Sequence, residues 1–416
     1  MSEGKGLVPR LRFPEFRQMT GWREYAGSDL FDQVNDRNAE TGLPVLSITQ
    51  EHGAIPRELI NYHVSVSEKS IERYKIVNAG DFIISLRSFQ GGIEYSRYRG
   101  VCSPAYVVLR RSIEGKNAYF RHYLKTDRFI QLLTKNLEGL RDGKMISYRQ
   151  FSDLRLPVPS ASEQQKIADC LSSLDELIAA LARKVGALKT HKIGLMQQLF
   201  PREGETQPRL QFPEFLGFAA WATMNLDQLA NIYSGSTPAK SNPEFWIGAI
   251  PWVSAKDMKT LFLDDAEDHI SAGAVNDGAR LVPPGTLLML TRGMTLLKDI
   301  PICVLQCEMS FNQDVKALKP KIGVNGLFLA LMLTGNKQRL LEMVDIAGHG
   351  TGKLNTDDLK AFALMLPSPK EQQRIANCLT SLDILITATT QELGTLKTHK
   401  KRLMQQLFPL AEAHEA

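Results

Sequence analysis

The sequence lacks the features that mark secreted chains, membrane-spanning chains and most metal sites. Its 416 residues include five cysteines, and no second pair completes the spacing of Cys303 and Cys307, which indicates a reducing compartment and no zinc site. The first residues contain no apolar core of the signal-peptide type, and no apolar run approaches the ~18 residues of a membrane span. We therefore expect a protein of the cytoplasm.

Strong charge of either sign is also missing. The formal net charge is only +5, and 43% of the residues are hydrophobic, as in ordinary globular chains. This balance permits nucleic-acid binding through one basic face but does not require it.

Complete catalytic motifs are absent as well. The segment Gly348–Lys353 resembles a phosphate-binding loop, but Ala347 occupies the first glycine position and Leu354 stands where Ser or Thr is required. Residues 242–245 lack the second proline of the Asn-Pro-Pro-aromatic motif of adenine methyltransferases. We interpret both segments as turns, and the carboxylates between Asp264 and Asp268 as an exposed loop. We expect a non-catalytic chain that holds no metal and no cofactor of its own.

What the chain does contain is a duplication. Residues 163–201 and 371–409 align without a gap, and two-thirds of their positions are identical. The octapeptide PRLRFPEF at Pro9–Phe16 returns as PRLQFPEF at Pro208–Phe215. A period of about 200 residues repeats a whole domain plus a helix, rather than the short unit of a solenoid. The stretches between, 20–158 and 216–367, resemble each other only faintly.

These landmarks divide the chain into successive parts. We expect a first domain at residues 1–158, a long helix at 159–201, a second domain at 202–367, a second long helix at 368–409 and a frayed tail at 410–416. Short apolar runs between Gly and Pro turns predict strands near Leu43–Ile48, Asp81–Leu86, Tyr106–Arg110 and Thr286–Leu290. Helical stretches near Ala118–Leu137 and Gly326–Val344 make both domains mixed α/β, in the α+β class.

Both long segments carry an apolar seam with alternating steps of three and four residues, typical of a coiled coil. Lys192 and Lys400 interrupt the two seams at equivalent positions. The seam residues are Ile167, Leu171, Leu174, Ile178, Leu181, Val185 and Leu188 in the first helix, and Ile375, Leu379, Leu382, Ile386, Leu393 and Leu396 in the second.

The ends of the two helices are marked by the sequence. Ser162 with Gln165, and Ser368 with Glu371, are predicted to form capping boxes, and Pro201 and Pro409 end the helices. About 38 residues make a helix of roughly 57 Å. Neither helix can bury its seam alone, so we expect the two to pair in antiparallel fashion, related by a pseudo-two-fold axis. The alternative is that each helix packs only on its own domain.

Polar and basic side chains on glycine-rich loops are candidates for DNA contact. Arginine and glutamine can form paired hydrogen bonds with guanine and adenine, and lysine or tyrosine can contact the backbone. Lys144 and Lys353 fall at matching positions before the two helices. The candidates are Arg87, Ser88, Gln90, Tyr95, Arg97, Tyr98, Arg99 and Lys144 in the first domain, and Ser236, Thr237, Lys240, Ser254, Lys256, Arg292, Lys298 and Lys353 in the second.

Taken together, the sequence resembles the specificity subunits of type I restriction–modification enzymes. The resemblance covers essentially the whole chain and is carried by the two LMQQLFP helices, the two octapeptides, SGSTPAKSNPEFWIGAIPWVSAKDM and FNQDVKAL in the second domain, and KIVNAGDFIISLRSFQGG in the first. The first domain lacks the Ser-Thr-Pro loop of the second, so residues cannot be mapped from one domain to the other.

The resemblance implies a prokaryotic, cytoplasmic protein with two target-recognition domains separated by two antiparallel helices. Each domain would bind one half of a split, asymmetric site in double-stranded DNA, and the helix pair would fix the gap between the halves. It further implies two modification subunits that use S-adenosylmethionine, and restriction subunits that use ATP with Mg²⁺; none of these cofactors is expected on this chain.

Two other classes stay open at this point. One is a DNA methyltransferase or nuclease whose active site carries no recognisable motif. The other is a coiled-coil scaffold that binds partners without reading bases.

Overall fold

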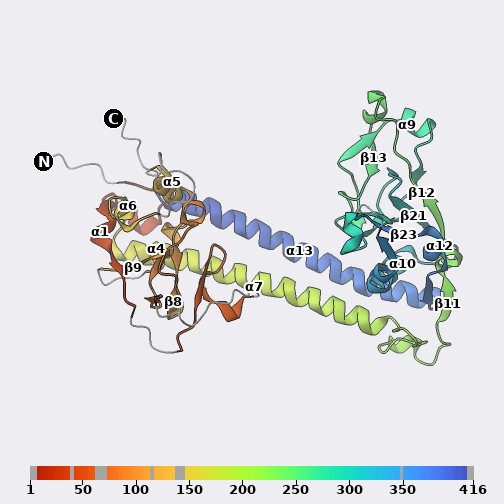
Figure 1. Cartoon of the computed structure of the whole chain (residues 1–416), viewed down its shortest axis with the longest axis horizontal. Helices are drawn as coiled ribbons and strands as arrows, with labels where there is room; N and C mark the ends of the chain where they lie inside the picture. The colour runs from red at the N-terminus through yellow and green to blue at the C-terminus, as the bar shows by residue number, and fades with distance from the viewer. Residues whose placement is uncertain are drawn as a thin grey trace. The chain divides into compact units, whose positions relative to one another are not determined.

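The computed structural model describes residues 7–37, 42–60, 73–112, 117–135, 146–346 and 350–409. The chain divides into two compact units (Figure 1). Unit 1 comprises Met1–Arg183 with Thr390–Ala416, and unit 2 comprises Lys184–Thr389. Each unit therefore holds one variable domain and parts of both long helices, α7 (Ala161–Leu199) and α13 (Pro369–Leu407).

The domain of unit 1 is built from short strands and short helices. Its strands are β1 Arg23–Ala26, β2 Phe31–Val34, β3 Leu46–Thr49, β4 Gly53–Pro56, β5 Lys75–Val77, β6 Phe82–Ile84, β7 Glu94–Tyr95, β8 Gly100–Cys102, β9 Val107–Arg111 and β10 Arg155–Val158. Its helices are η1 Pro14–Phe16, α1 Gly27–Leu30, η2 Arg57–Leu59, α3 Ser88–Gly91, α4 Ala118–Tyr123, α5 Asp127–Lys135 and α6 Tyr148–Ser152. The main sheet has the order β2-β9-β6-β7, and all its pairs are antiparallel.

The domain of unit 2 contains larger sheets. Its strands are β11 Ala222–Asn225, β12 Ala230–Ser234, β13 Ile250–Val253, β14 Phe262–Leu263, β15 Asp268–Ile270, β16 Leu281–Val282, β17 Leu287–Leu290, β18 Arg292–Gly293, β19 Ile302–Leu305, β20 Met309–Phe311, β21 Val315–Pro320, β22 Val344–Ile346, β23 Gly352–Leu354 and β24 Ala363–Leu366. Its helices are η3 Pro213–Phe215, α8 Leu226–Leu229, η4 Pro243–Trp246, α9 Ala272–Asn276, η5 Met294–Leu297, α10 Gly326–Gly335, α11 Lys337–Glu342 and α12 Thr356–Ala361.

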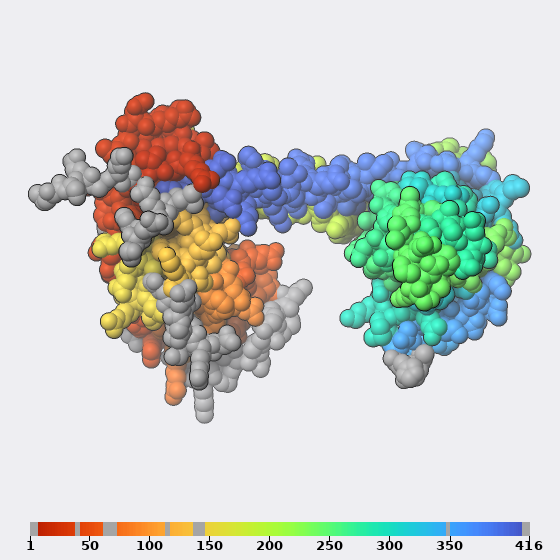
Figure 2. Space-filling model, turned by 90° about the horizontal axis from the view of Figure 1, so that it is seen from above, coloured from red at the N-terminus to blue at the C-terminus, as the bar shows by residue number. Residues whose placement is uncertain are grey.

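Two sheets dominate this second domain. One has the order β12-β21-β17-β19-β14 and the other β15-β13-β20-β16. The pairs β13–β20 and β14–β19 are parallel, whereas the remaining pairs of both sheets are antiparallel. Figure 2 shows the face of unit 2 on which β13 and α9 lie.

The two domains share a frame that their sequences do not reveal. In each, the strand after the octapeptide pairs with the strand before the long helix: β1 with β10, and β11 with β24, both antiparallel. Trp22 and Trp221, at equivalent places before those first strands, are both buried. A short helix follows each first strand and packs on another, α1 on α6 and α8 on α12. The fold class expected from sequence, mixed α/β with an internal repeat, is confirmed.

The predicted strands all exist, and the predicted helices are broken. The stretch expected at Ala118–Leu137 forms α4 and α5, and residues 136 and 137 lie outside the described residues. Thr126 causes the break, because its hydroxyl donates to the carbonyl of Tyr123 (2.7 Å) and accepts from the amide of Phe129 (3.2 Å). The stretch expected at Gly326–Val344 likewise divides into α10 and α11, with Asn336 between them.

Within each unit, α7 and α13 run antiparallel, as expected. In unit 1, Ile167 and Leu171 share a core with Leu407 and Phe408. In unit 2, Leu199 shares a core with Ile375 and Leu379. The predicted seam positions are buried or half-buried throughout both helices, whereas Leu177, Ile193, Ile384 and Leu385, off the seam, are exposed.

The lysines that interrupt the seams form ion pairs between the two helices. In unit 1, Lys400 donates to Asp175 at 2.5 Å. In unit 2, Lys192 donates to both carboxylate oxygens of Asp383 at 2.6 and 2.8 Å. Lys192 and Lys400 are equivalent in the repeat, as are Asp175 and Asp383, so one cross-link occurs once in each unit. A charge pair at a single seam position fixes the register of a helix pair.

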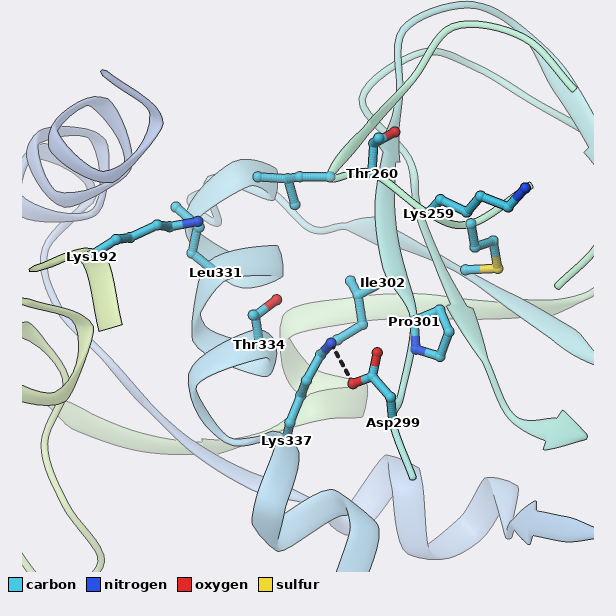
Figure 3. Close-up of a pocket in the computed structure, with 11 residues that line it drawn as sticks. Lys192, Lys259, Thr260, Asp299, Pro301, Ile302, Leu331, Thr334 and Lys337 are labelled. Carbon is cyan, nitrogen blue, oxygen red and sulfur yellow. Dashed lines mark hydrogen bonds and ion pairs between the residues drawn. The ribbon is translucent and has the colours of Figure 1, made fainter. Parts of the chain in front are cut away.

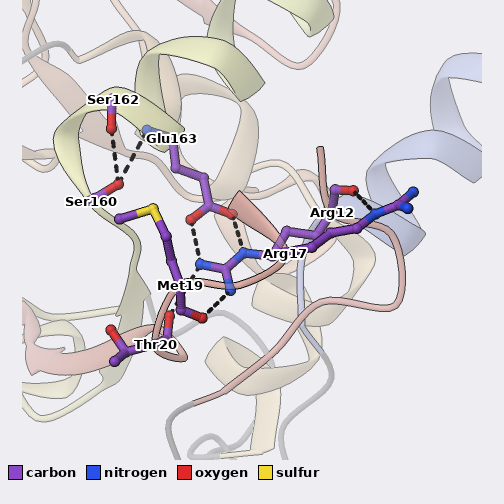
Figure 4. Close-up of polar contacts among 7 residues, drawn as sticks. All are labelled: Arg12, Arg17, Met19, Thr20, Ser160, Ser162 and Glu163. Carbon is purple, nitrogen blue, oxygen red and sulfur yellow. Dashed lines mark hydrogen bonds and ion pairs between the residues drawn. The ribbon is translucent and has the colours of Figure 1, made fainter. Parts of the chain in front are cut away.

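Each octapeptide holds the start of one long helix and the end of the other. In unit 1 the buried guanidinium of Arg12 donates twice to Glu163 near the start of α7, at 2.8 Å each (Figure 4). The amide of Leu11 donates to the carbonyl of Gln406 near the end of α13 (3.0 Å).

The same arrangement occurs in unit 2 with one substitution. Gln211, which replaces Arg12, donates to Glu371 at 2.9 Å, and the amide of Leu210 donates to the carbonyl of Gln198, also at 2.9 Å. We call each octapeptide with these contacts an octapeptide clamp. Duplicated sequence therefore makes duplicated contacts.

The predicted cap of the first helix is wrong by two residues. Helix α7 begins at Ala161, and the hydroxyl of Ser160, not Ser162, accepts the amide of Glu163 (3.3 Å; Figure 4). Ser160 is the repeat equivalent of Ser368, which accepts the amide of Glu371 as predicted (3.3 Å). The capping boxes themselves do not form, because Gln165 bonds to Asp169 and Glu371 accepts from Gln211.

Candidate nucleic-acid interface

In unit 2 the loop Ser234–Lys240 is fixed against the end of β20. A Cβ atom on Gly235 would lie 2.2 Å from the carbonyl oxygen of Asn312, so only glycine fits this close approach. The amide of Ser236 donates to the carbonyl of Phe311 (3.0 Å), and its own carbonyl accepts from the indole of Trp252 (3.1 Å). The loop is thus tied to both β13 and β20.

The turn at residues 312–314 joins the predicted groups of this domain. The hydroxyl of Thr237 donates to the side chain of Gln313, which is exposed. The next carbonyl, of Asp314, accepts from the amides of Thr291 (2.8 Å) and Arg292 (3.2 Å). Gln313 was not singled out from the sequence, although an Asn-Gln-Asp turn between two apolar strands was a signal for it.

Two exposed cations face each other across a strand pair beside this turn. Arg292 of β18 is the register partner of Lys353 of β23, with Asp345 of β22 on the other side of Lys353. Lys298, at the end of η5, is also exposed. Like charges directly opposite in an antiparallel pair are unfavourable. An anion bound there would relieve the repulsion.

Other predicted residues of unit 2 are occupied within the chain. The amide and hydroxyl of Ser254 donate to Asp257 (2.9 and 3.0 Å), forming a turn. Lys256 pairs with Asp268 (2.9 Å) and Glu267 (3.3 Å), and the hydrogen bond to Asp268 is the largest cause of its raised pKa. A phosphate contact by Lys256 would compete with both carboxylates. Lys240 is exposed.

In unit 1 the predicted residues around α3 divide into exposed and buried ones. Arg87 and Gln90 are exposed, beside Phe89 (39% exposed). Ser88 is 1% exposed, and its hydroxyl accepts the amide of Ser85 (2.9 Å), so it shapes the turn and is not available to a ligand. Tyr95 packs against Phe82, with ring centroids 5.2 Å apart.

A second exposed loop of unit 1 carries Arg97, Tyr98 and Arg99. Ser96 shapes it, because its hydroxyl donates to the carbonyl of Tyr98 (2.8 Å). The hairpin of β3 and β4 lies next to it, through a bridge between Ala54 and Ser96. A Cβ on Gly91 would lie 2.6 Å from the side chain of Gln50, so the hairpin tip also abuts α3. No sequence pattern predicts that this hairpin tip lies beside α3. Lys144 lies outside the described residues.

Among the residues that the structure describes, no group of three or more His, Cys, Asp or Glu side chains is placed to hold a metal ion. In the same part of the chain, no helix has the length and apolar character needed to cross a membrane.

The sequence matches a known protein family. The sequence model of the "Type I restriction modification DNA specificity domain" matches residues 24–189 and 219–398, most of the chain. The EcoR124I/EcoR124II specificity subunit of Escherichia coli is 27% identical over 253 residues, which cover 58% of this chain and 59% of that protein. The MjaIX specificity subunit of Methanocaldococcus jannaschii is 29% identical over 171 residues, 40% and 38% of the two chains. The chain thus matches less than two-thirds of the length of these two relatives.

Solved structures show the same fold at low sequence identity. The type I restriction–modification S subunit of M. genitalium superposes with a TM-score of 0.58 at 16% identity, covering 98% of this chain and 100% of that one. A chain from a study of assembly and conformational transition in a type I restriction–modification system gives 0.57 at 19% identity, covering 94% and 98%. With two matched stretches that span both domains and both long helices, this chain belongs to the type I restriction–modification DNA specificity family.

Proposed function

We propose that this chain is the DNA-specificity subunit of a type I restriction–modification complex and catalyses nothing itself. In this proposal the domains at 1–158 and 202–367 each read one half of a bipartite, asymmetric site in double-stranded DNA. The helices at 159–201 and 368–409 set the spacer between the halves and dock two modification subunits.

One observation carries the proposal: a duplicated frame holds two dissimilar domains. The ion pairs Lys192–Asp383 and Lys400–Asp175, and the two octapeptide clamps, make equivalent contacts in both units. The loops that carry the exposed cations and amides differ completely between the units. A constant frame with variable loops is suited to one fixed spacing between two unrelated half-sites.

Equivalent surfaces on the two helices are suited to two copies of one partner. Thr190 with His191, and Thr398 with His399, are repeat equivalents and are exposed in their units. S-adenosylmethionine would then be bound by the modification subunits, and ATP with Mg²⁺ by the restriction subunits.

The direct test is methylation mapping in cells that carry this chain with its modification partner. We expect a single bipartite motif with a methylated adenine in each half, and no methylation or cleavage by the purified chain alone. A continuous motif, or none, would sink the proposal. Binding of S-adenosylmethionine by the isolated chain would favour an enzyme instead, and equal affinity of the assembled complex for all DNA would favour a scaffold.

Domain exchange tests the division of labour. Replacing residues 20–158 with the corresponding domain of another family member is expected to change one half of the methylated motif and leave the other half and the spacer unchanged. Replacing residues 216–367 is the matched experiment for the other half. A change in both halves from either exchange would contradict independent reading.

At the residue level we single out Gln313. It is exposed, accepts the hydroxyl of Thr237 and precedes Asp314, whose carbonyl accepts the amide of Arg292. Gln313→Ala is expected to relax the motif at one or two positions of one half-site, since a lost bidentate contact costs about 1–3 kcal/mol of discrimination. Gln338→Ala, an exposed glutamine on α11, is the matched control. An unchanged motif in Gln313→Ala would remove this residue from the readers.

A further inference from the structure

A cavity of about 730 Å³ lies in unit 1, between α5 and the last turns of α13. Figure 1 shows these two helices side by side at that end of unit 1. None of the DNA candidates lines it. Its walls are formed by Arg10, Lys125, Thr126, Asp127, Arg128, Gln131, Leu132, Lys135, Lys397, Lys400, Lys401, Met404, Gln405 and Phe408.

The rim of the cavity is strongly cationic. Seven Lys or Arg side chains and one carboxylate, that of Asp127, line it. Three of the seven are paired: Lys401 with Asp127 (3.2 Å), Lys400 with Asp175 and Lys125 with Glu94 (2.5 Å each). Among the described residues, no carboxylate pairs with Arg10, Lys135 or Lys397. The described residues around this opening therefore carry an excess of positive charge, which favours an anionic ligand.

Arg128 adds a group that lacks its partner. Its Nη1 atom is buried and makes no hydrogen bond with the described residues. Burial also lowers the pKa of this guanidinium. A buried donor without an acceptor is unfavourable, so a carboxylate or another acceptor that enters the cavity would be stabilising there.

The floor of the cavity is apolar. Leu132 and Met404 are half-buried, and Phe408 packs between Tyr119 and Tyr123, with ring centroids 5.6 Å from each. A phosphate group is polar and would make no favourable contact with this apolar floor. An amphipathic protein segment would use both parts, placing apolar side chains on the floor and carboxylates at the rim.

The equivalent place in unit 2 is more filled. Met196 is buried, whereas its repeat equivalent Met404 is half-buried; Phe200 is buried, as its equivalent Phe408 is. Phe200 packs on Phe328 of α10, and a Cβ on Gly335 would lie 3.0 Å from the same ring. A cavity of about 180 Å³ lies beside Lys192 (Figure 3), and another of about 240 Å³ lies where α7 ends at Pro201. The space at the duplicated helix end is therefore larger in unit 1 than in unit 2.

We propose that the cavity of unit 1 binds an acidic amphipathic segment of a partner protein, one segment per chain. The proposal does not depend on which DNA sequence the chain reads. It gives the two-fold frame a feature that is not duplicated, so that one partner binds where the repeat alone would predict two.

The test uses the full chain and a fluorescein-labelled helical peptide of Leu, Ala and Glu, with Leu at i, i+3, i+4 and i+7. Fluorescence anisotropy is expected to show saturable binding with one peptide per chain. A peptide of the same composition in scrambled order, and one with Lys in place of Glu, are expected to bind at least about tenfold more weakly. A random-sequence DNA duplex serves as a competitor.

Matched variants locate the site. Lys397→Glu with Lys401→Glu is expected to weaken peptide binding at least about tenfold, and Met404→Glu likewise. Lys189→Glu, the repeat equivalent of Lys397 and also exposed, is expected to change binding less than about twofold. Circular dichroism and melting temperature of each variant establish that it folds.

Several results would overturn the proposal. These are no binding to the wild-type chain, equal binding of the scrambled peptide, equal loss in Lys189→Glu, two peptides per chain, or displacement of the peptide by the DNA duplex at lower concentration than by unlabelled peptide. The last result would assign the cavity to nucleic acid. Methylation mapping is read separately, so failure here leaves the DNA-specificity proposal standing.

Discussion

At the scale of single residues, Lys192 and Lys400 show what a repeat can and cannot predict. Both were visible as breaks in an apolar seam, and Asp175 and Asp383 were present at equivalent positions of the two copies. Pairing each lysine with the aspartate of the other helix requires the antiparallel register, which no spacing within one helix contains. In the structure, the cores that Ile167 and Leu171 share with Leu407, and Leu199 with Ile375 and Leu379, accompany that register.

A double-mutant cycle on Lys192 and Asp383 measures the coupling free energy of this ion pair. Both side chains are about four-fifths buried. We expect a coupling free energy of about 1 kcal/mol between Lys192→Ala and Asp383→Ala, measured by urea unfolding. The pair Lys360 and Asp357 is exposed and serves as control, with an expected coupling below about 0.5 kcal/mol. Equal coupling in both pairs would contradict a role in register.

His122 provides a second prediction at this scale. Burial, and then the charge of Lys400, lower its pKa from the ordinary 6.5 to about 3, against the opposing effect of Asp175. Between pH 6.5 and about pH 3, His122 is therefore protonated in the unfolded chain and neutral in the folded chain. The stability of unit 1 is expected to be complete above pH 6.5 and to fall by about 1.4 kcal/mol per pH unit below it.

The check is hydrogen exchange of unit 1 between pH 7.5 and 5, with His122→Gln as the variant. The variant is expected to flatten the dependence on pH, because no proton is then taken up on unfolding. His191→Gln, on an exposed part of α7, is expected to keep it. A slope that His122→Gln leaves unchanged would assign the effect to other groups.

The candidate DNA contacts stay a prediction, and the structure shows only which of them are exposed. Arg87, Gln90, Arg97, Arg292 and Lys353 are exposed, as a reader requires. Ser88 belongs to the turn beneath them. Gln313 and Gln50, which lie beside the candidates, were not named from the sequence, because contacts between loops distant in sequence create this surface and leave no local pattern. Residue type and glycine spacing indicate the loops, and the fold decides which side chains point outward.

At the scale of elements, long periodic helices were predicted well and their caps less well. Seam, length and approximate ends of α7 and α13 followed from periodicity and proline. Ser160 was overlooked because Ser162 offers the same chemistry two residues later, and only the contact with the amide of Glu163 distinguishes them. Short helices such as α4 and α5 were merged, since a single threonine separates them.

The cap assignment is directly testable. Ser160→Ala is expected to destabilise the start of α7 by about 1 kcal/mol, because the hydroxyl satisfies an amide that has no partner within the helix. Ser162→Ala is expected to change stability by less than about 0.5 kcal/mol. Thermal unfolding followed at 222 nm compares the two variants on the same scale, as the ~222 nm signal reports helix. The reverse order would restore the cap predicted from sequence.

At the scale of the whole molecule, the shared frame of the two domains escaped the sequence. Its strands are only four residues long, and β1 pairs with β10 across the entire first domain. Such short strands carry little periodicity, and pairing across a domain leaves no local signal. The duplicated octapeptides and helices marked the outer limits of that frame, and the structure shows that it continues inward from them.

Because the two clamps are equivalent, we expect folding and function to tolerate a change in the position of the chain ends. Joining residue 409 to residue 7 through a short linker and reopening the chain near 202–207 is expected to preserve folding and the methylated motif, because both clamps stay intact. The same linker inserted between residues 203 and 204 of the natural chain is the control. A permutant that fails to fold while the control folds would contradict equivalence of the two clamps.

The clamp of unit 1 also sets an order in time. Unit 2 is continuous in the chain, whereas the core of unit 1 includes Leu407 and Phe408, and its octapeptide holds the carbonyl of Gln406. Synthesis proceeds from residue 1, and domains generally fold as they emerge. The domain that leaves the ribosome first is therefore completed last, when the final helix arrives to close it.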